Sequence, residues 1–125
     1  MSIKIAIVDD EIQIRSLIEQ TMEDIEGEPE ILTAKNGAEG LTIIEAERPQ
    51  LVFLDVMMPL MNGYEVCAAV RNNPDLVGTT IVMLTAKGQE ADRTHGLENG
   101  AHHFLTKPFD PDELLTLANE ILHLS

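Results

Sequence analysis

The sequence predicts an α/β domain in which one parallel sheet has helices on both faces. Short apolar runs alternate five times with longer stretches of helical periodicity. The runs IKIAIV and LVFL contain no polar alternation, as is typical of strands that are covered on both faces. Strands joined through helices in this way form right-handed crossovers, so the strands are expected to run parallel.

The order of the elements follows from the change between continuous apolar runs and helical spacing. The strands are expected over residues 3–8, 30–34, 51–55, 80–86 and 102–105. The helices are expected from Glu11 to Gly27, over 37–48, 64–71 and 88–99, and from Asp110 onward. The stretch over 88–99 is the least regular of them, because Leu97 is its only large apolar residue.

Polar side chains and prolines mark where several of these helices begin and end. Asn36 is expected to cap the second helix, which ends before Pro49. In the final helix Pro111 takes the first position, and Glu113 is expected to complete a capping box with Asp110. These signals support the alternation of strands and helices that defines the fold class.

Length and charge exclude several classes of protein. The chain has 125 residues, of which 44% are hydrophobic, so we expect one domain over residues 1–125. Eight Lys and Arg against 22 Asp and Glu give a net charge of -14, which repels a phosphate backbone and predicts no direct contact with nucleic acid. The single Cys67 forms no internal disulfide, and no apolar run reaches signal-peptide or membrane-span length. We expect a soluble protein of the reducing cytoplasm, without membrane insertion.

Chemically distinctive residues follow the predicted strands. Asp9 and Asp10 come after the first strand, Asp55 ends the third, Thr85 lies near the end of the fourth, and Lys107 follows the fifth. The carboxyl ends of parallel strands share one edge of the sheet, so these side chains are expected to meet there. Carboxylates so close together repel by up to ~4 kcal/mol per pair at an effective dielectric near 20, so a cation is needed among them.

The ligand types indicate which cation this edge binds. Carboxylate oxygens without Cys or His suit a hard ion that keeps several waters, which means Mg²⁺ or Mn²⁺. Lys107 adds a positive charge for a further anion, and Thr85 adds a hydroxyl donor. A carboxylate nucleophile beside a metal ion and a lysine is sufficient for phosphoryl transfer.

The motifs VDDE, LDVMMP followed by NG, LTA and TKPF occur in an order and spacing that resemble the receiver domain of bacterial two-component response regulators, including chemotaxis regulators. The similarity extends over essentially the whole chain. It implies a three-layer flavodoxin-like sandwich with strand order 2-1-3-4-5. It also implies a signalling switch that catalyses only its own phosphorylation and dephosphorylation.

The resemblance implies a role for each residue of the site. Asp55 would be the phosphoacceptor for a sensor histidine kinase or a phosphotransfer protein. Mg²⁺ would be bound by Asp55, by Asp10, by the backbone carbonyl of Met57 and, through a water, by Asp9. Lys107 would contact the phosphoryl oxygens.

Other residues would change conformation on phosphorylation or set the lifetime of the acyl phosphate. The resemblance implies that Thr85 and Phe104 form the switch and that the Lys107–Pro108 bond is cis. The signal would leave through a surface of the fourth helix, the fifth strand and the fifth helix. Met57 and Lys87 lie where the family sets how fast water reaches the acyl phosphate, so we expect this pair to change its lifetime.

The last helix also carries more apolar residues than one core-facing stripe needs. These are Leu114, Leu115, Leu117, Ala118, Ile121, Leu122 and Leu124. The surplus predicts a surface for a partner or for a homodimer. The adjacent His102 and His103 point to opposite faces of a strand, which favours one sheet histidine and an exposed neighbour over a metal site.

Two other functions compete with the phosphorylated switch. The first is a metal-dependent phosphohydrolase that uses Asp55 on an external substrate. Met57 argues against it, because it stands two residues after Asp55, where such an enzyme has a second acid. The second is an interaction or dimerisation module that is not phosphorylated. The complete set of acidic residues, Thr85 and Lys107 argues against this one.

Overall fold

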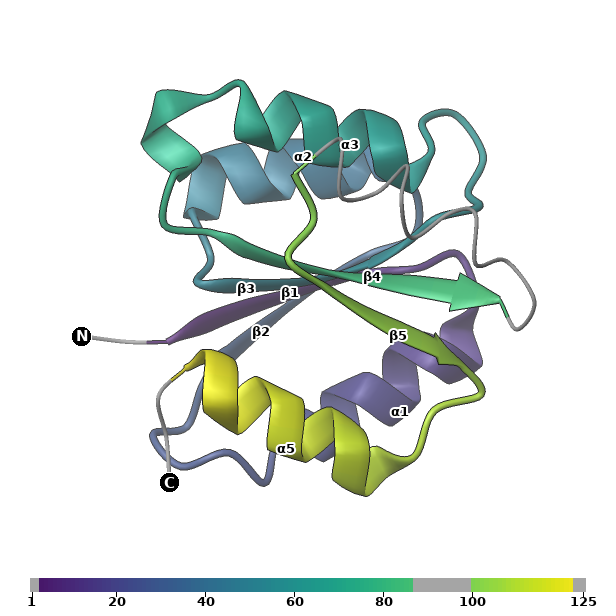
Figure 1. Cartoon of the computed structure of the whole chain (residues 1–125), viewed down its shortest axis with the longest axis vertical. Helices are drawn as coiled ribbons and strands as arrows, with labels where there is room; N and C mark the ends of the chain where they lie inside the picture. The colour runs from purple at the N-terminus through teal and green to yellow at the C-terminus, as the bar shows by residue number, and fades with distance from the viewer. Residues whose placement is uncertain (1–2, 87–99, 123–125) are drawn as a thin grey trace.

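A computed structural model describes residues 3–86 and 100–122 and shows a parallel sheet between two layers of helices (Figure 1). The strands are β1 (Lys4–Val8), β2 (Glu30–Ala34), β3 (Leu51–Asp55), β4 (Thr80–Ala86) and β5 (His103–Lys107). Their order is β2-β1-β3-β4-β5, and every neighbouring pair is parallel. The predicted fold class and strand order are confirmed.

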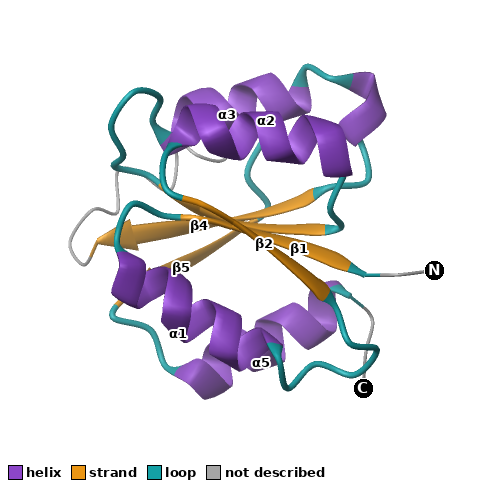
Figure 2. Cartoon of the chain, turned by 180° about the vertical axis from the view of Figure 1, so that it is seen from behind, coloured by secondary structure: helices purple, strands orange, loops and turns teal. Residues whose placement is uncertain are grey.

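The helices lie on both faces of the sheet, as Figure 2 shows. One layer holds α1 (Ile12–Met22) and α5 (Pro111–Ile121), and the other holds α2 (Gly37–Glu47) and α3 (Gly63–Arg71). A short 3-10 helix, η1 (Pro74–Leu76), leads toward β4. The predicted helix over 88–99 lies outside the described residues. No helix of the described ranges is long and apolar enough to cross a membrane.

The core has two halves because successive residues of each strand point to opposite faces. In β3, Val52 and Leu54 pack with α2 and α3, whereas Leu51 and Phe53 pack with α1 and α5. All five residues of β3 are buried, which explains why this strand has no polar alternation. Asp55 therefore ends a strand that is held rigidly from both sides.

The first helix ends earlier than its periodicity predicts. It stops at Met22 rather than near Gly27. Two backbone hydrogen bonds then form tight turns: Asp24 N–H donates to Thr21 O at 3.2 Å, and Ile25 N–H donates to Met22 O at 3.1 Å. These i to i+3 bonds bend the chain while Ile25 stays only 3% exposed. The buried isoleucine continues the apolar pattern without continuing the helix.

Two further local predictions need correction. The Asp110 side chain accepts from Asp112 N–H at 2.8 Å, so the predicted capping box with Glu113 is wrong. Strand β5 spans His103–Lys107 rather than 102–105, because its pairing with β4 continues to Ala86 and Lys107 at the polar end. Apolar runs alone do not reveal that continuation.

Candidate functional site

Parallel pairing brings the ends of β1, β3 and β5 to one edge of the sheet. Asp55 is the last residue of β3, and Asp9 directly follows β1. Backbone pairing continues past the strands, with Asp9 N–H donating to Ala34 O at 3.2 Å and Val56 N–H donating to Leu84 O at 3.3 Å. These bonds fix the backbone on either side of the acidic residues.

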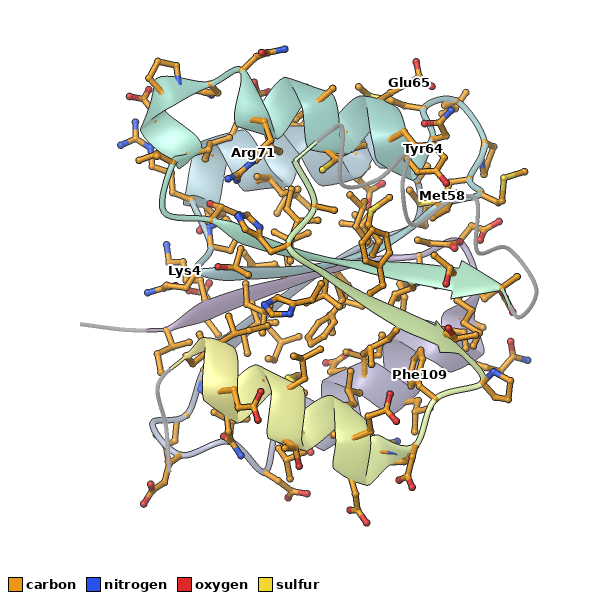
Figure 3. All side chains as sticks on the ribbon, in the orientation of Figure 1. Lys4, Met58, Tyr64, Glu65, Arg71 and Phe109 are labelled. Carbon is orange, nitrogen blue, oxygen red and sulfur yellow. The ribbon has the colours of Figure 1, made fainter. Side chains whose placement is uncertain are left out.

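The loop from β3 to α3 is held against the same edge by close backbone approach. Gly63 N–H donates to Val56 O at 2.9 Å, and a Cβ at Gly63 would clash with the carbonyl oxygen of Asp55. A capping box between Asn62 and Glu65 then starts α3 immediately after the loop. Figure 3 shows Glu65 at this end of α3, above Met58 and Tyr64.

Asp9, Asp10 and Asp55 form the acidic cluster that the sequence predicts. One carboxylate oxygen from each lies within 4.8 Å of the others. Asp9 is 0% exposed and Asp55 is 6% exposed, whereas Asp10 is exposed. The cluster thus has two buried members and one that faces water. It is the only such group of potential metal ligands in the ranges 3–86 and 100–122.

Lys107 reaches into this cluster from the end of β5. Its Nζ lies 2.8 Å from Asp9 Oδ2, 3.2 Å from Asp55 Oδ1 and 3.4 Å from Glu11 Oε1. Only 16% of the lysine side chain is exposed. The Lys107–Pro108 peptide bond is cis, and the following Phe109 is buried against the α1 and α5 layer (Figure 3). One ammonium group therefore serves several carboxylates.

Burial and crowding change the acidity of these groups. Burial, together with the charge of Asp9, raises the pKa of Asp55 to about 7, although Lys107 partly opposes this. Burial also raises the pKa of Asp9. The carboxylates in turn raise the pKa of Lys107 in spite of its own burial. The lysine stays charged at neutral pH, but it does not neutralise the cluster.

Two residues that sequence reasoning left without a role support Asp9. Glu11 donates its backbone N–H to Asp9 Oδ1 at 2.8 Å, and its side chain is the third carboxylate near Lys107. Arg15 donates from Nη1 to the backbone oxygen of Asp9 at 2.7 Å. The position of Glu11 directly after the aspartate pair was a usable signal. By contrast, no sequence pattern indicates that the Arg15 side chain extends from α1 to the backbone of Asp9.

The cluster fits a hard divalent ion. Its donors are oxygens only, two carboxylates are already desolvated, and exposed Asp10 leaves a side open for waters. Such an ion would offset the repulsion that raises the pKa of Asp55. Met57 lies in the following turn with 67% of its surface exposed, and metal binding by its carbonyl stays a prediction.

The predicted switch residues lie on the neighbouring strands. Thr85 is 6% exposed in β4 and pairs in register with Thr106 of β5. Phe104 pairs with Met83 and packs with the α2 and α3 half of the core. Their switching roles stay predictions, and Lys87 lies outside the described residues.

The two histidines lie near the opposite end of β5. Both are exposed, and His102 Nδ1 accepts a hydrogen bond from Ile81 N–H at 3.1 Å. Although His102 is exposed overall, its partial burial, followed by the charge of Arg71, lowers its pKa. This favours the neutral imidazole that the hydrogen bond requires.

Comparison with known proteins places this arrangement in a family. A family model described as "Response regulator receiver domain" matches residues 5–119. The chain belongs to the response regulator receiver family. Receiver domains of response regulators are signalling modules of two-component systems, they have histidine kinase partners, and they typically bind Mg²⁺ at an acidic pocket.

Curated relatives are longer than this receiver chain. A "Probable transcriptional regulator ycf27" of Cyanophora paradoxa is 50% identical over 111 residues, which cover 89% of this chain and 44% of that protein. The "Alkaline phosphatase synthesis transcriptional regulatory protein PhoP" of Bacillus subtilis is 41% identical over 125 residues, which cover 100% of this chain and 50% of that protein. The chain thus spans about half the length of these relatives.

Solved receiver structures match over nearly their full length. A putative response regulator from Chloroflexus aurantiacus has a TM-score of 0.89 at 32% identity, with 98% of this chain and 99% of that chain covered. Chemotaxis response regulator CheY4 of Vibrio cholerae has a TM-score of 0.87 at 34% identity, with 97% and 99% covered. These matches agree with the flavodoxin-like receiver fold described above.

Proposed function

We propose that this receiver accepts a phosphoryl group on Asp55 in a Mg²⁺-dependent reaction and thereby switches a surface that acts on a downstream protein. The observation that carries the proposal is the juxtaposition of Asp9, Asp10, Asp55 and Lys107 at one sheet edge. A buried carboxylate with one lysine and room for a cation has the parts that phosphoryl transfer needs.

The transfer step uses Asp55 as the nucleophile. An Asp55 carboxylate oxygen bonds to phosphorus while the bond from phosphorus to the donor breaks. The donor is a phosphohistidine of a sensor kinase or a phosphotransfer protein, and its imidazole nitrogen keeps the electron pair. The product is an acyl phosphate on Asp55 and a free histidine. The chain catalyses this reaction only on itself. It likewise catalyses the hydrolysis of its own acyl phosphate, in which water attacks phosphorus and the products are the free Asp55 carboxylate and inorganic phosphate.

Residues around Asp55 bind the phosphoryl group and the metal ion. Lys107 holds one phosphoryl oxygen, since its ammonium already lies 3.2 Å from the Asp55 carboxylate. Asp10, Asp55 and the Met57 carbonyl would bind Mg²⁺ directly, and Asp9 would bind it through a water. The bound ion would supply positive charge that balances the phosphoryl oxygens. Mn²⁺ has the same preference for oxygen ligands and can replace it.

Switching passes from the phosphate to β4 and β5. Thr85 turns its hydroxyl toward the new phosphate, and Phe104 changes rotamer. The altered surface consists of the predicted fourth helix, β5 and α5. The names of the relatives support a transcriptional output, whether in a longer chain or a separate protein. With a net charge of -14, the receiver itself does not contact nucleic acid.

The lifetime of the acyl phosphate is tuned by Met57 and Lys87. The Met57 side chain is 67% exposed in the turn that follows Asp55, so it stands where water approaches. Replacing both residues by alanine should change the dephosphorylation rate. An unchanged rate would remove this part of the proposal.

Acetyl phosphate provides the test of Asp55 chemistry. The protein and its Asp55→Asn variant are incubated with acetyl phosphate, with and without Mg²⁺, and their intact masses are measured promptly. We expect one added phosphoryl group in the native protein with Mg²⁺ and none in the variant. In a parallel incubation with a small phosphomonoester instead of acetyl phosphate, turnover far beyond one equivalent per protein would instead indicate a phosphohydrolase. No labelling by acetyl phosphate or by a kinase would favour an unphosphorylated interaction module.

A further inference from the structure

Lys107 is surrounded by negative charge before any phosphoryl group arrives. Its Nζ donates hydrogen bonds to Asp55 Oδ1 at 3.2 Å and to Glu11 Oε1 at 3.4 Å, and it lies 2.8 Å from Asp9 Oδ2. An ammonium group has three N–H donors, and three carboxylates already surround this one. A phosphoryl oxygen that contacts Lys107 therefore has to take the place of a carboxylate.

Glu11 is the carboxylate that leaves Lys107 most easily. Asp9 is 0% exposed, and its other oxygen accepts a hydrogen bond from Glu11 N–H at 2.8 Å. Asp55 has to stay at the site, because it is the proposed nucleophile. The Glu11 side chain is 57% exposed and makes the longest of the three contacts, so water solvates its carboxylate once it moves away.

Helix capping does not explain the direction of the Glu11 side chain. Glu11 is the N-cap residue of α1, but its side chain accepts no capping hydrogen bond from the helix. Its backbone oxygen accepts from Ile14 N–H and Arg15 N–H, each at 3.1 Å. The dipole of α1 favours a negative charge at this position, but it does not direct the carboxylate to a lysine 96 residues away. Figure 1 shows α1 below the carboxyl end of β5, where the two elements are joined by this contact.

We propose that Glu11 is a positioning residue that competes with the phosphoryl group for Lys107 and so disfavours small phosphoryl donors of high negative charge. A donor with two negative charges, such as acetyl phosphate, approaches the Glu11 carboxylate and has to displace it. A phosphohistidine on a protein partner gains further binding energy from the protein surface around it, which offsets this cost. The inference rests on the proposed phosphorylation of Asp55 and adds a residue that sets donor specificity.

Labelling kinetics with two small donors test this competition. At pH 7 acetyl phosphate carries two negative charges, whereas phosphoramidate carries one net negative charge because its nitrogen is protonated. The intact mass of the native protein and of Glu11→Gln is followed over time at several concentrations of each donor, with Mg²⁺ present. We expect Glu11→Gln to lower the half-saturating concentration of acetyl phosphate about threefold, with the maximal rate changed less than about twofold. The change for phosphoramidate should be smaller, at about 1.5-fold, because its charge is lower.

The variant changes only the side chain that is in question. Asp9 accepts from the backbone N–H of Glu11, which glutamine retains. A purely structural role of Glu11 would therefore change the labelling of both donors by the same factor. That outcome would contradict the proposal.

Glu19→Gln provides the matched control. Glu19 is an exposed carboxylate of the same helix, so its replacement removes the same charge and leaves the acidic cluster unchanged. We expect it to change the half-saturating concentration of acetyl phosphate less than about 1.5-fold, and added salt should reduce the difference between Glu11→Gln and the native protein. Equal gains from both variants would mean that the net charge of -14 acts without a specific contact, and they would overturn the proposal.

Inorganic phosphate measures the competition without phosphoryl transfer. The amide NMR signals of Val56 and Lys107 are followed as inorganic phosphate is added to each protein with Mg²⁺ present. We expect Glu11→Gln to bind phosphate about threefold more tightly than the native protein and Glu19→Gln. Equal affinity in all three proteins would refute the competition, whether or not Asp55 is labelled. Tighter binding by Glu11→Gln without any labelling of Asp55 would support the competition for Lys107 and reject the proposed phosphoacceptor.

Discussion

The two ends of the sheet use charged and polar side chains in opposite ways. At the amino edge several polar groups have separate partners: Lys4 Nζ lies 3.1 Å from Glu47, Thr79 Oγ1 donates to Pro49 O at 2.9 Å, and Arg71 Nη2 donates to Thr79 O at 2.6 Å. At the carboxyl edge one lysine is shared by several carboxylates. Figure 3 shows Lys4 and Arg71 toward one end of the sheet and Met58 and Phe109 toward the other.

The difference separates stabilising polar contacts from a chemical site. Paired groups at the amino edge satisfy backbone atoms at the start of β1 and on the approach to β4. The carboxyl edge keeps unbalanced negative charge. Burial, followed by the charge of Asp9, raises the pKa of Asp55 there to about 7. Such imbalance lowers stability and is retained where a cation or a phosphoryl group completes the site.

Removing the shared lysine should have the largest effect on stability. Lys107→Met leaves the buried carboxylates of Asp9 and Asp55 without a cation, so we expect the free energy of unfolding to fall by about 3 kcal/mol at pH 8 without Mg²⁺. Urea denaturation measures this change. Mg²⁺ should restore part of the loss. A variant as stable as the native protein would show that Lys107 does not balance the cluster.

A comparable substitution at the amino edge should respond differently to metal. Arg71→Ala removes the donor to Thr79 O at 2.6 Å and to Leu76 O at 3.2 Å, and we expect a loss of about 2 kcal/mol. The same denaturation experiment measures it. Mg²⁺ should not offset this loss beyond its effect on the native protein. If Mg²⁺ stabilised Arg71→Ala more than the native protein, the two edges would not differ in their dependence on a cation.

The pH dependence of stability should isolate the carboxyl edge. The folded-state pKa of Asp55, about 7, lies above its ordinary value of 3.8, so folded protein retains a proton that unfolded chain has lost. Without Mg²⁺ this lowers the free energy of unfolding as pH rises from about 4 to about 7, by at most ~1.4 kcal/mol per pH unit. The free energy of unfolding is measured against pH for the native protein and for Asp55→Asn, and the difference between the two should fall with this slope. A difference that does not change with pH would contradict the raised pKa.

The smallest effect is expected at the exposed ion pair of the amino edge. Lys4 and Glu47 are 29% and 38% exposed, so Glu47→Gln should change the free energy of unfolding by less than about 0.5 kcal/mol. Its salt dependence should match that of the native protein. A loss above 1 kcal/mol would mean that this edge also depends on a desolvated charge.

Much of this architecture is predictable because burial leaves a simple pattern. The residues of β3 are all apolar up to Asp55, and parallel topology then places Asp9, Asp55 and Lys107 together without further information. Ends of elements were less predictable. Ile25 continues the apolar helical spacing although the helix has already ended. Lys107 belongs to β5 because its backbone pairs with Ala86, and the residue types in this stretch do not indicate that pairing.

The contacts that support the site were not predictable for a related reason. Glu11 meets Lys107 across a sequence separation of 96 residues, and Arg15 reaches back to the carbonyl of Asp9. Both contacts depend on where a flexible side chain ends in three dimensions. Spacing in the sequence fixes the face of an element but not the atom that such a side chain reaches.

The charge imbalance at the carboxyl edge should be relieved by a cation. The most direct test is the free energy of unfolding of the native protein and of Asp55→Asn at pH 8, each with and without Mg²⁺. Without Mg²⁺ the variant should be more stable than the native protein by about 2 kcal/mol, and Mg²⁺ should stabilise the native protein more than the variant. A variant that is less stable than the native protein without Mg²⁺, together with equal stabilisation of both by Mg²⁺, would rule out a charge imbalance that a cation relieves.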